Sequence, residues 1–123
     1  MKLNPDCIRD ILLYCEENCK GIDGVTFYGN ETIGEAKYEP SVLMEHLKQC
    51  KLSGFFKDGS GKKSWGHFLV NGLTPCGYEF LASLREPSIF EEIKAKFKEN
   101  AIDATIELML TFGKTLIKGR LGM

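Results

Sequence analysis

Prolines mark the helix boundaries of this chain more clearly than any other residue type. The four prolines are Pro5, Pro40, Pro75 and Pro87. Proline suits the first turn of a helix, where its missing N–H is not needed, and it disfavours helical geometry in the residue before it. We therefore expect helices to begin at the first three prolines and one helix to end before the fourth.

Apolar side chains recur at helical spacing after each of these starts. Ile8, Ile11 and Cys15 share one face of a first helix, which Asn4 can cap. A fourth helix is expected to start at Ser88, because Ser88 and a glutamate three residues later have capping-box spacing. The predicted helices cover residues 5–19, 41–50, 75–84, a stretch from residue 88, and residues 103–118.

Two segments between the helices are rich in β-forming residues. Residues 22–38 carry such residues interrupted by three glycines, which predicts one or two short strands or an irregular loop. Residues 54–57 and 65–71 are expected to pair as a hairpin around a polar tip, Asp58–Lys63. Helices combined with one hairpin predict an α+β fold.

Two short patterns resemble winged-helix proteins. "LMEHLKQCKLSGFF" (Leu43–Phe56) resembles the passage from an amphipathic helix into the wing, and "LTPCGYEFL" (Leu73–Leu81) resembles the start of the helix that often follows it. Over nearly its whole length, the chain is similar to the bacterial and prophage family catalogued as domain of unknown function 2513. The opening "LNPDCIRDILLYCEEN" and the closing "LIKGRLG" are among the five motifs that carry this resemblance.

The resemblance implies a winged-helix-like domain, helices plus a β-hairpin wing, over residues 1–86. Residues 87–123 would form a C-terminal helical pair that packs on this domain. In winged-helix proteins two tandem helices precede the wing, and the second enters the major groove. Residues 22–38 stand in the place of the first of these helices but are glycine-rich and β-like. The family implies no catalytic or binding residues.

Positive charge is concentrated in one part of the chain. The formal net charge is −1, but residues 41–66 hold five basic and two acidic side chains, an excess of three positive charges. Lysines bind double-stranded DNA by displacing counterions from its phosphates. On the hairpin, Lys57, Lys62 and Lys63 are the candidates for such contacts. On the second helix, the candidate DNA contacts are Lys48, Gln49 and Lys51, whose side-chain types can pair with base edges. A solvated helix face and a polar hairpin loop would have the same composition.

Trp65 and His67 lie where the predicted hairpin closes. Such rings can stack on a nucleic-acid base or on a partner protein. Aromatic side chains of a two-stranded ribbon more often cover the core, so we expect both residues to be packed.

The last predicted helix has a wider apolar face than packing on its own domain requires. Its apolar side chains, which include Leu108, Phe112 and Leu116, occupy an arc of roughly 200°, whereas one packed stripe needs about 100°. We expect these three residues to contact a second copy of the chain or another protein. The alternative is a helix sunk between the fourth helix and the rest of the domain.

Several classes of function are not indicated. No apolar run reaches the roughly 18 residues of a membrane span, and the N-terminus lacks a signal-peptide core. Five scattered cysteines, an odd number, favour a reduced, cytoplasmic setting. No cysteine or histidine stands in a metal-binding or catalytic pattern, so we expect no metal, no cofactor and no enzymatic activity.

Two hypotheses about function remain. The first is a nucleic-acid-binding regulator of a mobile element, held as a dimer by its last helix. The second is a protein-interaction module that uses the same apolar helix and does not bind DNA. The near-neutral net charge favours the second, whereas the winged-helix resemblance and the local positive charge favour the first.

Overall fold

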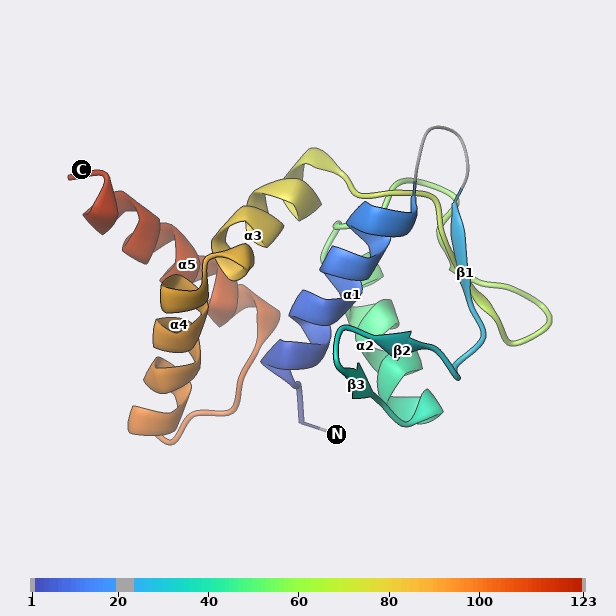
Figure 1. The fold of residues 1–123 in the computed structure, drawn as a ribbon, viewed down its shortest axis with the longest axis horizontal. Helices are drawn as coiled ribbons and strands as arrows, with labels where there is room; N and C mark the ends of the chain where they lie inside the picture. The colour runs from blue at the N-terminus through green and yellow to red at the C-terminus, as the bar shows by residue number, and fades with distance from the viewer. Residues whose placement is uncertain (1, 20–23, 123) are drawn as a thin grey trace.

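A computed structural model of the chain describes residues 2–19 and 24–122 (Figure 1). The helices within these residues are α1 (Pro5–Asn18), α2 (Pro40–Leu52), α3 (Pro75–Arg85), α4 (Pro87–Glu99) and α5 (Ile106–Arg120). The strands are β1 (Val25–Phe27), β2 (Thr32–Ile33), β3 (Ala36–Lys37), β4 (Gly61–Lys62) and β5 (Phe68–Val70). This arrangement of helices and a hairpin confirms the predicted α+β fold class.

The first two helices start where the prolines predict. Asn4 caps α1, since its side-chain oxygen accepts a hydrogen bond from the N–H of Asp6 at 3.0 Å. The backbone N–H of Asn4 in turn donates to Nε2 of His46, a fully buried residue of α2, at 2.8 Å. One residue therefore both begins α1 and fastens it to α2.

Strands β2 and β3 form a small hairpin that docks on α1. The turn residue Gly34 has a φ of +59°, and a side chain there would come within 2.9 Å of a carboxylate oxygen of Asp10. Glycine meets both the conformational and the steric demand. The Tyr38 hydroxyl donates to the other Asp10 oxygen at 2.7 Å. Short strands were predicted between residues 22 and 38, of which residues 22 and 23 lie outside the described residues.

The other three strands form an antiparallel sheet with the order β1-β5-β4. Lys62 of β4 pairs with Phe68 of β5, so the hairpin turns over residues 63–67. The predicted tip, Asp58–Lys63, is therefore wrong. Asp58 and the residue after it form a separate, earlier turn in the segment that leads to β4. The Asn71 side chain donates a hydrogen bond to the Asp58 carbonyl oxygen of this turn at 2.9 Å.

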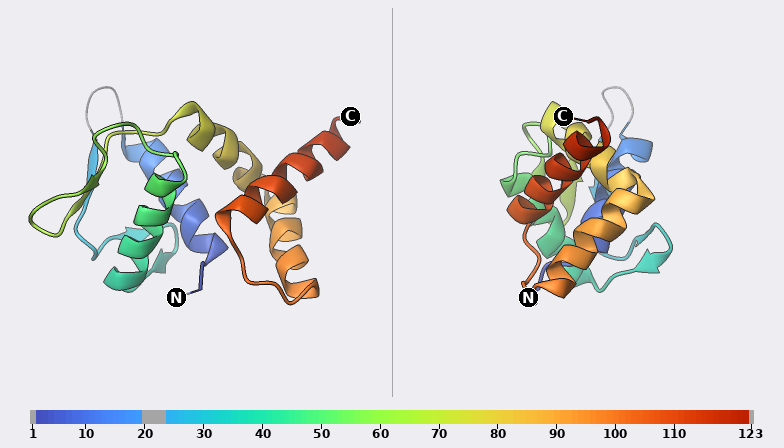
Figure 2. Two further views of the ribbon diagram at one scale, coloured as in Figure 1. Left: turned by 180° about the vertical axis from the view of Figure 1, so that it is seen from behind. Right: turned by 90° about the vertical axis from the view of Figure 1, so that its left-hand side faces the viewer.

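Helices α3, α4 and α5 pack on one another, and α3 also packs on α1 (Figure 2). Thr74 caps α3 as its position before a proline suggests, accepting a hydrogen bond from the N–H of Gly77 at 3.1 Å. The predicted capping box at Ser88 is wrong, because Glu86 caps α4 instead. The end of α5 and the loop of the β4–β5 hairpin lie at opposite ends of the molecule (Figure 1).

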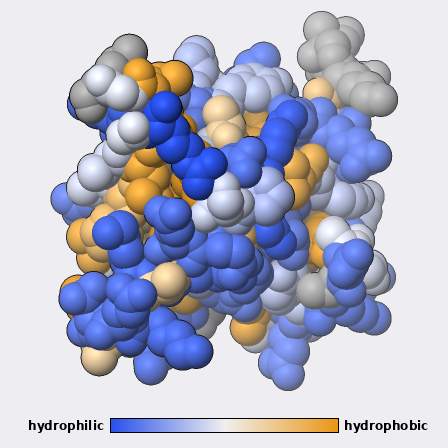
Figure 3. Space-filling view, turned by 60° about the vertical axis from the view of Figure 1, so that its left-hand side comes forward, coloured by the Kyte–Doolittle hydropathy of each residue, from blue (hydrophilic) through white to orange (hydrophobic). Residues whose placement is uncertain are grey.

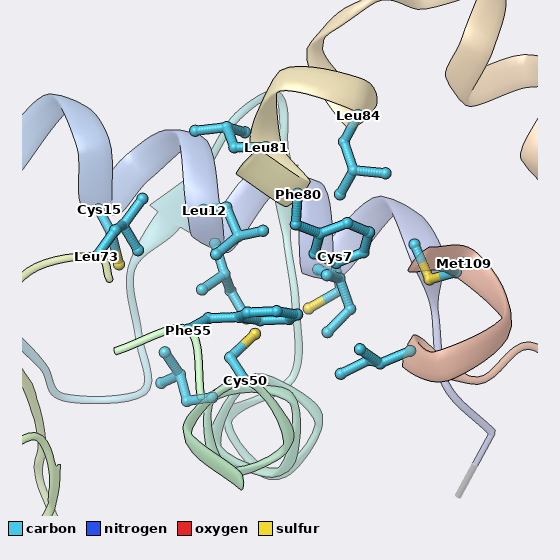
Figure 4. Close-up of a cluster of buried hydrophobic side chains, with 14 of the residues drawn as sticks. Cys7, Leu12, Cys15, Cys50, Phe55, Leu73, Phe80, Leu81, Leu84 and Met109 are labelled. Carbon is cyan, nitrogen blue, oxygen red and sulfur yellow. The ribbon is translucent and has the colours of Figure 1, made fainter. Parts of the chain in front are cut away.

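Buried apolar side chains connect the N-terminal helices with α3 and α5 (Figure 4). Phe55 and Phe80 pack with their ring centroids 4.9 Å apart, and Met109 of α5 is fully buried in the same cluster. Cys7 behaves as a small apolar residue: burial raises the pKa of its thiol to about 12. This core crosses the predicted boundary at residue 86, and the division into two parts stays a prediction.

Candidate nucleic-acid interface

A groove of about 550 Å³ lies between α2 and the β4–β5 hairpin. Lys48 and Lys51 of α2 and Lys62 of β4 line it, together with the apolar side chains of Met44 and Phe68. Three of the six candidate DNA contacts thus come together from two separate elements. Glu45 also lines the groove, so its charged side chains are three lysines and one glutamate.

Lys51 lies across the first residue of β4. A β-carbon on Gly61 would stand 2.5 Å from Nζ of Lys51, closer than atoms can approach. Glycine at this position therefore leaves room for the ammonium group to reach the hairpin. The contact brings a charge of α2 next to Lys62, the following residue of β4.

The other three candidates do not line the groove. Gln49 donates a side-chain hydrogen bond to Glu45 at 3.3 Å. Lys57 extends along Gly72, where an added β-carbon would stand 3.3 Å from the lysine side chain. Lys63 donates from Nζ to the carbonyl oxygen of Gly59 at 3.0 Å.

Among the lysines of the described residues, Lys2 and Lys94 form ion pairs, and the other lysines, in the groove and elsewhere, form none. Lys94 of α4 pairs with Asp6 at 3.3 Å and with Glu91 at 3.2 Å. For the five lysines of residues 41–66, no ion pair is formed with any acidic residue of the described ranges. Their charges are consequently available to an anionic ligand.

The loop at the end of the β4–β5 hairpin is a closed turn. The N–H of Lys63 donates to the His67 carbonyl at 2.8 Å, and that of Gly66 donates to the Lys63 carbonyl at 2.9 Å. Gly66 has a φ of +82°, as expected for a glycine that ends a three-residue hairpin loop. These contacts hold the middle residue, Trp65, at the outermost point of the hairpin.

Trp65 is 82% exposed, so the expectation that it packs on the core was wrong. The ring of His67 does pack, edge-on against Tyr28, with centroids 4.4 Å apart. The spacing of Lys63 and Gly66 was the sequence signal for a three-residue loop with Trp65 in its centre. The more glycine-rich segment that precedes it drew the predicted tip away from this position.

Two cysteines, Cys15 and Cys19, lie at the C-terminal end of α1 next to the sheet. The Cys19 thiol lies 3.6 Å from the carbonyl oxygen of Val70 and is partly exposed, whereas Cys15 is buried. The hydrogen bond from the Cys15 thiol lowers the pKa of the Cys19 thiol to about 7. No group of three or more potential metal ligands occurs within the described residues.

The candidate partner residues lie on α5, which packs between α3 and α4. Phe112 contacts Phe97 of α4 with ring centroids 5.3 Å apart, and Leu108 and Leu116 are partly buried against the core. Apolar surface is still visible at this helical end of the molecule (Figure 3). No described helix is long and apolar enough to cross a membrane.

The fold and the groove define an α+β protein of helix-plus-hairpin architecture with a cationic groove beside the hairpin. The sequence profile of the family described as hypothetical protein (DUF2513) matches residues 2–103, so the chain belongs to this family. All of α5 and the residues after it follow the matched segment. Searches of curated proteins and of solved structures find no significant match.

Proposed function

We propose that the protein is a DNA-binding regulator of a bacterial mobile element and binds double-stranded DNA through α2 and the β4–β5 hairpin. In this proposal it acts in the cytoplasm, catalyses no reaction and needs no metal or cofactor. A second surface, on α5, holds two copies of the chain together as a dimer.

The groove between α2 and β4 is the observation that supports this proposal. Lys48 and Lys51 meet Lys62 there although the end of α2 and two turns separate Lys51 from β4. Charges gathered on one surface from different elements, without acidic partners among the described residues, suit a polyanion better than they suit folding stability.

The β2–β3 hairpin changes how such a protein would contact DNA. In helix-turn-helix proteins the first helix crosses the phosphate backbone and the second reads the major groove. Here the β2–β3 hairpin precedes α2, and Glu45 on the groove wall would repel phosphate. We therefore assign the backbone contacts to the groove lysines and expect affinity to depend more on phosphates than on base sequence.

Salt dependence is the decisive measurement. Fluorescence anisotropy would follow the binding of a duplex of about 25 base pairs at 50 and at 200 mM salt. Three lysine–phosphate contacts predict a slope of log K against log salt of about −2.7, which is a loss of about 40-fold over this range. Absence of binding at 50 mM, or an affinity that salt does not change, would overturn the proposal.

A pair of charge-matched variants locates the binding. Lys51→Glu with Lys62→Glu alters the groove, and Lys2→Glu with Lys98→Glu makes the same change in net charge on exposed positions of the N-terminal segment and α4, outside both the groove and α5. The groove variant should bind at least tenfold more weakly at 50 mM salt, and the control should bind almost as the wild type. Equal losses would show that net charge, and not the groove, governs binding.

A groove between α3 and α5 favours a second candidate function, protein interaction without DNA binding. It measures about 460 Å³, and Phe80, Leu110 and Ile117 contribute apolar side chains to its walls. A second copy of the chain or another protein would bury this surface. Sedimentation equilibrium tests whether a second copy of the chain covers this surface. A wild type that stays monomeric at high micromolar concentration contradicts the dimer.

A further inference from the structure

The most exposed large apolar side chain of the described chain lies on the hairpin with the basic groove. Trp65 is 82% exposed, compared with 70% for Leu52 and 59% for Tyr28. The two hydrogen bonds of the turn and the positive φ of Gly66 hold its backbone in one conformation. A ring presented on a closed turn loses little conformational freedom when it binds, so this arrangement favours recognition.

The charges next to Trp65 indicate the chemistry of its ligand. Lys62 and Lys63 precede it in the same hairpin, and both side chains are exposed. Glu45 and Asp58 are the acidic residues of the stretch from residue 41 to residue 66 that contains the tip. A ligand for this tip should therefore combine negative charge with a flat apolar surface, and nucleic acid has both in its phosphates and its bases.

A continuous double helix offers this ring little to bind. Its outer surface presents phosphates and base edges, because the faces of the bases are stacked on one another. Single-stranded segments expose those faces, and aromatic side chains stack on them with little regard to sequence. The lysine groove suits the duplex and the tryptophan suits an unpaired base.

We propose that Trp65 stacks on an unpaired base next to the duplex held by the groove, so that the preferred ligand is a junction between double-stranded and single-stranded DNA. This inference rests on the proposed function and narrows its ligand. Lys62 and Lys63 would contact phosphates on either side of the stacked base.

The chain contains one tryptophan, which makes the contact directly observable. Two probes are compared at 50 mM salt: a blunt duplex of about 25 base pairs and the same duplex with a single-stranded extension. Intrinsic fluorescence reports on Trp65, and anisotropy with labelled probes gives both affinities. We expect the extended probe to bind between about fivefold and a hundredfold more tightly and to quench the tryptophan, with no quenching by the blunt duplex.

Variants separate stacking from a general effect on affinity. Trp65→Ala should lose the preference for the extension while keeping the affinity for the blunt duplex, and Trp65→Phe should keep part of the preference. Tyr78→Ala is the control, because Tyr78 is also an exposed aromatic residue but lies on α3. The preference should not change in this variant.

The possible failures are distinguishable. Salt-dependent binding with equal affinity for both probes would overturn the stacking inference and leave the proposed function standing. Quenching by the blunt duplex would overturn it as well, since the ring would then bind paired bases, either within the double helix or at its ends. Absence of binding to both probes would overturn the inference together with the proposed function and would direct attention to a protein ligand for Trp65.

Discussion

Replacement of His46 should destabilise the protein because this side chain links the two N-terminal helices. The residue is fully buried, Nδ1 lies 2.8 Å from the Val42 carbonyl oxygen, and Nε2 lies 2.8 Å from the backbone nitrogen of Asn4. A carbonyl can only accept a hydrogen bond and a backbone N–H can only donate one. The imidazole must therefore be neutral, with its proton on Nδ1 and the Nε2 lone pair directed at Asn4.

His46→Leu removes the acceptor and keeps an apolar side chain in the core. The Asn4 N–H, partly buried at the start of α1, then loses its partner, and an unsatisfied donor costs about 1–3 kcal/mol. His46→Gln can place its side-chain oxygen near the position of Nε2 and should lose less. The order of stability should be wild type, then the glutamine variant, then the leucine variant.

Urea denaturation measures these differences. With an m-value of about 1–3 kcal/mol per molar urea, a loss of about 2 kcal/mol lowers the midpoint by about 1 M. The slope itself should not change, which would show that the denatured state is unaffected. A leucine variant as stable as the wild type, or equal stability of the two variants, would refute the role assigned to the Asn4–His46 hydrogen bond.

Three further predictions concern packing, thiol chemistry and assembly. Gly77→Ala should destabilise the protein by about 1–3 kcal/mol, because the new β-carbon would stand 2.6 Å from the Phe55 carbonyl oxygen. Gly119→Ala on α5 should stabilise the protein by about 0.5–1 kcal/mol, because no atom lies within 4 Å of the new β-carbon. Thermal unfolding compares the two variants. The Cys19 thiol, whose pKa the Cys15 hydrogen bond lowers to about 7, should react with iodoacetamide at a rate that levels off above about pH 8. Peptide mass mapping that finds a rate still rising toward about pH 9, as for an ordinary thiol, would contradict this. Phe112→Glu should convert a dimer to monomers in analytical ultracentrifugation, provided that circular dichroism shows an intact fold.

Helix positions were the part of the fold that could be predicted best from the sequence. Asn4 caps α1 as expected, and three helices start at the predicted prolines. The signals for these features lie within one helical turn, so that a short stretch of sequence contains them. The start of α4 was missed because Glu86 and Pro87 end one helix and begin the next, a double role that a capping-box rule does not represent.

The hairpin could be predicted only in outline. Its existence follows from β-forming residues around polar ones, but its register depends on the pairing of β5 with β1 and β4, from distant parts of the chain. The register decides which residue stands at the outermost point. The sequence pattern placed the tip too early, and Trp65 was consequently expected to be packed.

The candidate site could likewise be predicted only in part from the sequence. The local excess of lysines between residues 41 and 66 is visible in the sequence, and it supplied five of the six candidate DNA contacts. Only the tertiary structure shows that Lys48, Lys51 and Lys62 share a groove and that Gln49 does not. Distances between side chains of different elements depend on how those elements pack, which no local pattern records.

The sequence by itself thus determined the α+β class, the helical segments and the region of positive charge, because capping, proline geometry and apolar periodicity act over a few neighbouring residues. The tertiary structure decided that His46 joins α1 to α2, that Lys51 reaches β4, and that Trp65 is exposed. Each of these depends on contacts between residues far apart in the chain, and such contacts form only when the elements pack around a common core.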